Sequence, residues 1–350
     1  MGIDAPEVFA PVLDRLRVDA AKHYGSSTTR LVASRYDERP FSHVLRVEVH
    51  KDAGTGPAAG LFVKVFKADA DRVEMMRDRV ANDYATTVSV YEAMRRHDDL
   101  GVVPPIACYP DLLAMVTEEV QGPTLLNHLT NHATWWSAAG AADINEGLER
   151  VGRWIRVFQG VNAAAEADAA DEMRDYIDHR LKRLVSMRHS GFEESGRTRV
   201  LRLVDSLSRA ADESDWDQVP VHSDMALGNI LIANGRIVVL DFAMAKSGNR
   251  LQDVSRVFLQ LDLLRAKPFI RSAVIAEGQR ALLRGFDVTL LPDRPMFRLM
   301  MLRHRINHLV GLIHDKHSFA GQMYNRGLIR RHYNWIRQEV NRTVPAGHVS

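Results

Sequence analysis

The chain has 350 residues and a formal net charge of +2; it exceeds one average domain and can bury a sizeable core. Its single cysteine, Cys108, excludes an internal disulfide framework and indicates a reducing, cytoplasmic compartment. Charges at Asp4, Glu7 and Asp14 interrupt the N-terminal residues, so no signal peptide or membrane span is expected there.

The first third of the chain is predicted to be rich in strands. A helix is expected over Ala5–Tyr24, and a second helix, about thirty residues long, after the third strand. The expected strands lie near Arg30–Arg35, Val44–His50, Gly60–Phe66, Val102–Tyr109 and Leu112–Glu118. From Pro123 onward the pattern is mostly helical, apart from Val219–Leu240. This order predicts an α+β chain with a β-rich part over residues 1–117 and a larger helical part over 123–350.

A hairpin is predicted inside the helical part. Asn234-Gly235 is the strongest two-residue signal for a type I′ turn, and the apolar runs Asn229–Ala233 and Arg236–Leu240 flank it. With this turn, Asn229 and Asp241 emerge side by side at the open end of the hairpin. An amide oxygen next to a carboxylate suits Mg²⁺ that keeps waters and borrows phosphate oxygens.

Two motifs surround this hairpin. His222, Asp224 and Asn229 fit the pattern H-x-D-x-x-x-x-N, and Leu240-Asp241-Phe242 fits a hydrophobic-Asp-Phe metal motif. The ordered set resembles the catalytic and metal loops of the protein-kinase-like superfamily, in the branch of aminoglycoside phosphotransferases and choline kinases. The resemblance implies a bilobal fold, ATP or GTP with Mg²⁺, and transfer of the γ-phosphate to a hydroxyl of a small molecule. It implies that Asp224 faces this hydroxyl and that Asn229 and Asp241 hold the metal.

The resemblance also implies where the nucleotide binds. Lys64, in the strand Leu61–Phe66, stands where the family has the lysine that holds the α- and β-phosphates; the alternative is a surface lysine of an edge strand. The stretch Glu118, Glu119 and Val120 resembles the hinge whose backbone binds adenine. The resemblance thus implies a β-rich lobe over residues 1–117, a hinge over 118–122, a helical lobe over 123–350, and a nucleotide in the cleft between the lobes.

An acidic partner for Lys64 is expected on the long helix. At roughly 100° per residue, Asp83 falls at the edge of the apolar face, whereas Glu74 and Glu92 lie far from it. Asp83 is therefore the expected partner, although the family usually has Glu. The alternative is that Asp83 is a solvated charge.

The glycines differ from a typical kinase pattern. The segment Tyr36–His43, expected to cover the phosphates, contains none, so contact there would come from backbone or from Ser42. Gly54-Thr55-Gly56 and Gly60 are interpreted as a flexible loop between strands. Ala243 follows Asp-Phe in place of glycine, which argues against a regulated activation loop.

Two further residues are expected to support the site. By the resemblance, His222 is an interior brace of the catalytic loop rather than its base, and Asp253 braces that loop through backbone N–H groups. A helix N-cap is the alternative for Asp253. His304 and His308, at i and i+4, with His314 and His317 nearby, are interpreted as surface or core histidines rather than as a metal site.

Charge indicates the class of acceptor. Residues Leu251–Ser350 contain sixteen Lys and Arg against seven Asp and Glu, a net charge of +9, whereas the preceding residues carry −7. Because aminoglycosides are polycations, this favours an anionic acceptor: a phosphorylated sugar, a nucleotide-linked sugar, or a lipid-linked saccharide reached by peripheral membrane contact. The alternative is that these charges form ordinary solvated helix faces. No nucleic-acid partner is expected.

Alternatives to this function remain. Within enzymes, the alternatives are an aminoglycoside or other antibiotic kinase, a choline-type kinase and a protein kinase; the short interval from Asp241 to Asp253 disfavours the last. A pseudokinase that binds without turnover is the alternative outside enzymes. The presence of Lys64, Asp224, Asn229 and Asp241 together favours the phosphotransferase.

Overall fold

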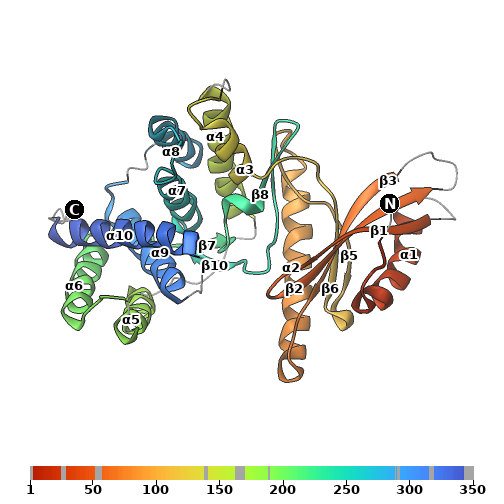
Figure 1. The fold of residues 1–350 in the computed structure, drawn as a ribbon, viewed down its shortest axis with the longest axis horizontal. Helices are drawn as coiled ribbons and strands as arrows, with labels where there is room; N and C mark the ends of the chain where they lie inside the picture. The colour runs from red at the N-terminus through yellow and green to blue at the C-terminus, as the bar shows by residue number, and fades with distance from the viewer. Residues whose placement is uncertain are drawn as a thin grey trace. The chain divides into compact units, whose positions relative to one another are not determined.

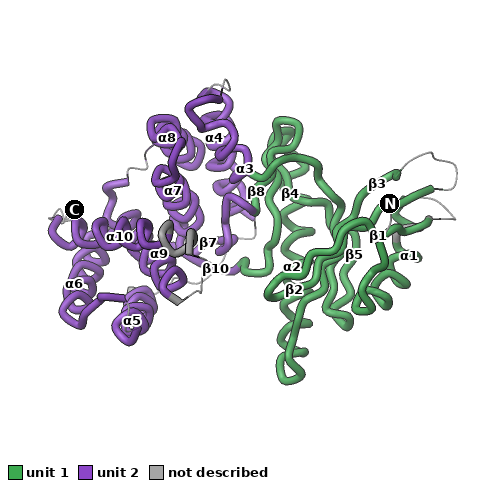
Figure 2. The backbone as a smooth tube through the Cα atoms, viewed as in Figure 1, with its two compact units in different colours: residues 1–124, 229–245 green, residues 125–228, 246–350 purple. Residues whose placement is uncertain are grey.

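The computed structural model describes residues 3–24, 29–51, 57–137, 141–161, 170–187, 190–287, 289, 292–314 and 319–342. The chain forms two compact units (Figure 2). The first unit comprises Met1–Thr124 and Asn229–Ala245, and the second comprises Leu125–Gly228 and Lys246–Ser350. Within the described ranges, no helix is both long and apolar enough to cross a membrane.

An antiparallel sheet forms the centre of the first unit (Figure 1). Its strands are, in spatial order, β1 (Thr29–Glu38), β2 (Ser42–Lys51), β3 (Pro57–Phe66), β6 (Ala114–Glu118) and β5 (Pro105–Tyr109). Successive residues of a strand point to opposite faces. Leu61, Val63 and Val65 of β3 share a buried core with Leu16 of helix α1 (Ala10–Tyr24). Lys64 therefore lies on the face of the sheet opposite to this core.

Helix α2 (Val73–Met94) packs on the face that carries Lys64. Its Val80 forms a buried cluster with Phe66 of β3 and Met115 of β6. Phe66 is two residues from Lys64 and so points to the same side of β3. This packing directs one face of α2 toward the surroundings of Lys64.

The predicted hairpin is present. Strands β8 (Ile230–Ala233) and β9 (Arg236–Val239) pair in the expected register, and Asn234 (φ 50°) and Gly235 (φ 77°) both have the positive φ of a type I′ turn. Strand β9 also pairs in parallel with β4 (Leu100–Val102). Because of this pairing, residues 229–245 group with the first unit, whereas the predicted boundaries placed them in the lobe 123–350.

The second unit is mostly helical. Its helices are α3 (Leu125–His132), α4 (Ala141–Gln159), α5 (Ala170–Ser186), α6 (Glu194–Ala210), α7 (Gln252–Leu264), α8 (Ser272–Phe286), α9 (Pro295–His314) and α10 (Phe319–Asn341). Strands β7 (Gln218–Val221) and β10 (Lys246–Asn249) pair antiparallel within it. Helices α4 and α8 approach closely because Gly285 has no side chain: a Cβ there would lie 1.9 Å from the carbonyl oxygen of Glu149.

Two sequence expectations need correction. The expected strand over Val102–Tyr109 is divided into β4 and β5, because Pro104 lies between them and has no N–H for a continuous ladder. Gly60 lies inside β3, so its assignment to a flexible loop was wrong. The remaining part of that expected loop, Gly54-Thr55-Gly56, lies outside the described residues.

Candidate active site

Lys64 and Asp241 form an ion pair in the first unit. The Nζ atom of Lys64 lies 2.8 Å from Oδ1 of Asp241. Asp241 follows strand β9 and has a φ of 66°, a left-handed conformation that costs a non-glycine residue free energy. Backbone strain of this kind is concentrated at functional sites. The lysine predicted to hold phosphates and the aspartate predicted to hold a metal are therefore in direct contact.

Asp83 takes a different place from the expected one. It is 1% exposed, and its carboxylate accepts a hydrogen bond from the N–H of Phe242. Burial raises the pKa of Asp83 to about 7, against the attraction of Lys64. Among the described residues, however, the carboxylate in ion-pair contact with Lys64 is Asp241, not Asp83. The expected direct pair is thus absent here, although α2 does turn Asp83 inward and Glu92 outward, at 59% exposure.

The hairpin holds the two expected metal ligands at its open end. The N–H of Leu240 donates to the carbonyl oxygen of Asn229 at 2.9 Å, which keeps Asn229 beside the start of the Leu240-Asp241 segment. Nowhere in the described parts of the chain do three or more His, Cys, Asp or Glu side chains gather as a metal site. An amide and a carboxylate offer hard oxygen ligands, which fit Mg²⁺ that completes its shell with waters and phosphate oxygens.

Two backbone N–H groups of the hinge segment are hydrogen-bonded within the sheet. The N–H of Glu118 donates to Pro104 O at 2.9 Å, and the N–H of Glu119 donates to Gly60 O at 2.8 Å. In an antiparallel ladder the reciprocal bond to the carbonyl of Glu118 would come from the nitrogen of Pro104, which carries no hydrogen. The carbonyl of Glu118 therefore lacks this ladder partner. Val120 follows directly after these bonded amides.

The side chain of Glu119 is also engaged. Its two carboxylate oxygens share the N–H of Arg46 Nε, at 2.8 and 2.9 Å, and Arg46 also pairs with Glu48. Gly60 makes this possible, because a Cβ at position 60 would lie 2.1 Å from Oε2 of Glu119. Both the side chain and the backbone N–H of Glu119 are therefore hydrogen-bonded to other strands of the sheet. Ser42, in turn, is 4% exposed, and a phosphate contact by Ser42 stays a prediction.

Asp253 braces the loop that precedes Asp224 in the second unit. Its carboxylate accepts the N–H of His222 at 2.6 Å and of Ser223 at 3.0 Å. Helix α7 has Leu251 at its N-cap position, so Asp253 lies within the first turn and the N-cap alternative does not hold. His222 and Asp253 are both fully buried. Burial raises the pKa of Asp253, while its interaction with His222 and these N–H donors oppose the shift.

Gln260 of α7 supports the same loop further along. Its amide oxygen accepts the N–H of Leu227 at 2.9 Å, and its amide nitrogen donates to Met225 O at 3.0 Å. Ser223 has a φ of 62°, which is unusual for a residue other than glycine. Residues of α7 thus hold the loop both before and after Asp224.

Sequence reasoning missed an arginine at this loop. Nη2 of Arg256 lies 2.5 Å from Oδ1 of Asp224. Arg256 is three residues after Asp253 on α7, so the two side chains emerge near one another on the helix. That spacing is the signal that could have identified Arg256.

A hollow of about 590 Å³ lies beside Arg256 within the second unit. Its polar lining includes Arg180 and Arg183 of α5, Gln260 of α7 and Asn307 of α9, and none of the described residues that line it is acidic. His304 and His308 also line it. Nε2 of His304 lies 2.9 Å from Gln252 O, and Nδ1 of His308 lies 2.8 Å from Nε2 of His332. These two histidines therefore have partners within the helices; the side chains of His314 and His317 lie outside the described residues.

The sheet, the Lys64–Asp241 contact and the braced Asp224 loop together define a phosphotransferase of the protein-kinase-like fold. The comparison with family models gives the particular family. Residues 57–288 match the model APH, described as the phosphotransferase enzyme family, and the chain belongs to this family. No curated protein sequence matches the chain. The resemblance stated from the motifs is thereby confirmed.

Solved structures agree on the fold. A thermostable mutant of aminoglycoside phosphotransferase APH(4)-Ia has a TM-score of 0.53 and 17% identity, with 92% of this chain and 98% of that chain covered. Choline kinase from Cryptosporidium parvum has a TM-score of 0.56 and 11% identity, with 96% and 97% covered. A choline/ethanolamine kinase family protein from Mesorhizobium loti has a TM-score of 0.54 and 13% identity, with 94% and 98% covered. The bilobal α+β fold class is confirmed.

Proposed function

We propose that this protein transfers the γ-phosphate of ATP, with Mg²⁺, to a hydroxyl of a small molecule that carries an anionic group. The observation that carries the first part is the contact between Lys64 and Asp241, which joins a phosphate ligand to a metal ligand at the end of the predicted hairpin. Asn229 supplies the second metal ligand. Bound Mg²⁺ would neutralise charge on the phosphates during transfer.

The hinge supports adenine rather than guanine. The carbonyl of Glu118, left without a ladder partner by Pro104, can accept the 6-amino group of adenine, and the N–H of Val120 can donate to the ring. Guanine carries an oxygen at position 6, which would face the Glu118 carbonyl with two acceptors and no proton. The proposal therefore favours ATP over GTP.

Asp224 serves the acceptor in this proposal. It orients the attacking hydroxyl and takes its proton as the bond from the hydroxyl oxygen to the γ-phosphorus forms and the bond to the β-phosphate oxygen breaks, which releases ADP. Asp253 and Gln260 hold the loop for this role. Arg256 pairs with Oδ1 of Asp224 and thereby orients the carboxylate.

The anionic acceptor is supported by the hollow beside Arg256. Three arginines line it, Arg180, Arg183 and Arg256, and its described lining contains no carboxylate. Guanidinium groups bind phosphate and carboxylate in a forked geometry, whereas a polycation would be repelled. A phosphorylated sugar, a nucleotide-linked sugar or a lipid-linked saccharide fits this lining. The last requires peripheral membrane contact, and a cytoplasmic location agrees with the single free Cys108.

A mass-shift screen tests the proposal. The protein is incubated with ATP, Mg²⁺ and three matched panels of hydroxyl compounds: anionic, neutral and cationic, with aminoglycosides and choline in the last. We expect one phosphoryl group to be added to a member of the anionic panel, and Asp224→Asn to abolish the product. Phosphorylation confined to the cationic panel would establish the aminoglycoside- or choline-type alternative. No product with any panel, despite Mg·ATP binding, would support the pseudokinase.

A further inference from the structure

A second hollow lies among helices α7, α8, α9 and α10, and it shares no described lining residue with the hollow beside Arg256. Its volume is about 620 Å³, within the range of small-molecule sites. The described lining carries four arginines and one carboxylate, a surplus of three positive charges. These residues are Arg265, Arg305, Arg330, Arg331 and Asp262.

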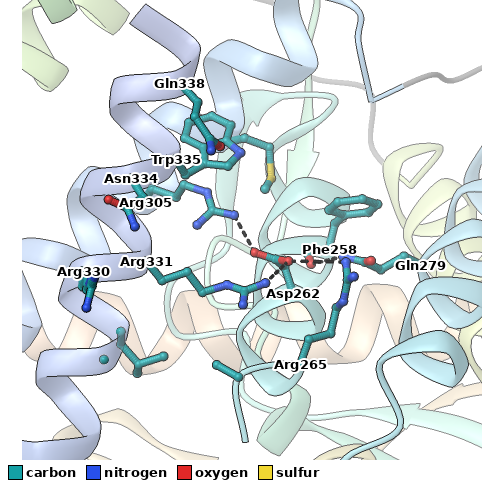
Figure 3. A pocket seen from close by; sticks show the side chains of 14 residues that line it. Phe258, Asp262, Arg265, Gln279, Arg305, Arg330, Arg331, Asn334, Trp335 and Gln338 are labelled. Atoms are coloured by element: carbon teal, nitrogen blue, oxygen red, sulfur yellow. Dashed lines mark hydrogen bonds and ion pairs between the residues drawn. The ribbon is translucent and has the colours of Figure 1, made fainter.

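Asp262 is the centre of this cluster. Figure 3 shows Arg305 of α9 and Arg331 of α10 converging on it, with Nη2 to carboxylate distances of 2.6 and 2.7 Å, and Arg265 approaches to 3.8 Å. Burial alone would raise the pKa of Asp262, but the hydrogen bond from Arg331 and the charge of Arg305 hold its pKa below its usual value. The carboxylate is therefore ionised, and its one negative charge offsets only one of the arginines.

Arg305 is buried more deeply than its bonds explain. Its side chain is 2% exposed and donates to Asp262 through Nη2, while its Nε and Nη1 atoms have no hydrogen-bond partner among the described residues. The guanidinium lies over the ring of Trp335, 4.5 Å from its centroid, which fixes its orientation. Burying a cation costs free energy, and an anion in the adjoining hollow would offset part of this cost by charge attraction.

We propose that this hollow is a second anion site that takes the phosphate group of a small molecule, apart from the acceptor hollow beside Arg256. The surplus of three positive charges is sufficient to neutralise a dianion, and forked guanidinium groups suit phosphate oxygens. Phe258, Met301, Leu328 and Trp335 supply apolar lining for the rest of the ligand. A buried arginine–aspartate cluster that served stability alone would need neither the hollow nor the additional arginines.

Calorimetry with two probes, inorganic phosphate and glucose 6-phosphate, tests this at constant ionic strength. Arg331→Gln removes one proposed phosphate ligand. Arg305 still pairs with Asp262 in this variant, so we expect the protein to remain folded. We expect Arg331→Gln to weaken binding about tenfold or more, a loss of about 1.4 kcal/mol. Arg280→Gln, an exposed arginine of α8 that does not line the hollow, is the matched control and should leave binding within about twofold.

The two probes distinguish the sources of the anion. Tighter binding of glucose 6-phosphate than of inorganic phosphate would support a phosphorylated small molecule, and equal binding would support free phosphate. Arg256→Gln should not change binding of either probe to this site. The proposal is overturned if neither probe binds, if Arg331→Gln binds as the wild type does, or if Arg256→Gln abolishes binding equally, because the anion would then occupy the acceptor hollow.

Discussion

Lys64 contacts Asp241 at 2.8 Å although 177 residues separate them in the chain. The contact exists because β3 turns Lys64 toward α2 and because β9, which leads to Asp241, pairs with β4 inside the first unit. Each of the two residues is also proposed to ligate a part of Mg·ATP, Lys64 a phosphate and Asp241 the metal, and the ammonium and the carboxylate each offer more than one hydrogen-bonding position. We infer that nucleotide binding loosens the pair as Lys64 turns to a phosphate and Asp241 to the metal, and that Asp83, which attracts Lys64, then helps to position the ammonium.

The first prediction concerns the metal ligand. Asp241→Ala should remove Mg²⁺-assisted ATP binding, because Asn229 alone is a poor Mg²⁺ site. Asp224→Asn should leave binding nearly intact and lower transfer by about 10²–10⁴. Titration calorimetry with and without Mg²⁺ measures the first effect. Equal Mg·ATP affinity for wild type and Asp241→Ala would contradict the metal assignment.

The second prediction separates Asp83 from its neighbours on α2. Asp83→Asn should weaken Mg·ATP binding, whereas Glu92→Gln, on the exposed side of the same helix, should not. Asp83→Asn should have the opposite effect on stability, which it should maintain or increase. Burial raises the pKa of Asp83 to about 7, so between about pH 4 and pH 7 the unfolded chain loses this proton while the folded protein keeps it. The free energy of unfolding therefore falls as pH rises through this range.

Asp83→Asn removes that penalty and should be at least as stable as wild type at pH 8, by urea unfolding. If the variant were both less stable at pH 8 and unimpaired in nucleotide binding, Asp83 would be an ordinary structural residue.

The hairpin could be predicted from the sequence because it depends on local signals, whereas the Asp253 brace was expected from the resemblance to a known family. Asn234-Gly235 fixes the register that places Asn229 beside Asp241, and the spacing from Asp241 to Asp253 places a carboxylate in the first turn of α7. Such signals depend on backbone conformation within a few residues.

Long-range side-chain pairs could not be predicted in the same way. Periodicity indicated which face of α2 is buried, but it could not indicate that Lys64 forms its ion pair with Asp241 and not with Asp83. The role of Gly60 depends on Glu119 crossing above it to reach Arg46, which no local pattern contains. The spacing from Asp253 indicates the side of α7 on which Arg256 lies, but its pairing with Asp224 on the loop depends on the packed structure.

The third prediction tests the hinge. Pro104→Ala adds an N–H that can bond to the Glu118 carbonyl, so it should compete with adenine and weaken ATP binding by about 1 kcal/mol, the net value of a hydrogen bond. The preference for ATP over GTP should fall as well. Pro105→Ala is the matched control, because adjacent residues of a strand direct their N–H groups to opposite sides and β5 is an edge strand. Equal effects of the two variants would argue against a free Glu118 carbonyl.

The fourth prediction concerns pH and stability. Burial lowers the pKa of His304 and of His332 to about 3. The unfolded chain takes up protons at these histidines below about pH 6.5, while the folded protein does not until about pH 3. The free energy of unfolding should therefore fall as pH decreases through this window, by about 1.4 kcal/mol per pH unit for each such histidine. Urea unfolding of wild type and His332→Asn measures the slope, which the variant should flatten.

The last prediction concerns the acceptor. If its anionic group binds the arginines beside Arg256, the KM for the acceptor should rise with added salt, because exposed charges are screened over about 8 Å at physiological ionic strength. The KM for ATP should change less. Arg183→Gln should raise the acceptor KM severalfold with little change in kcat, because Arg183 lines the hollow but does not contact Asp224. Lys182→Gln removes the neighbouring charge, which pairs with Asp178 outside the hollow, and should leave the KM unchanged. A neutral or polycationic acceptor, or a KM that ignores both salt and Arg183→Gln, would show that these arginines are ordinary solvated surface.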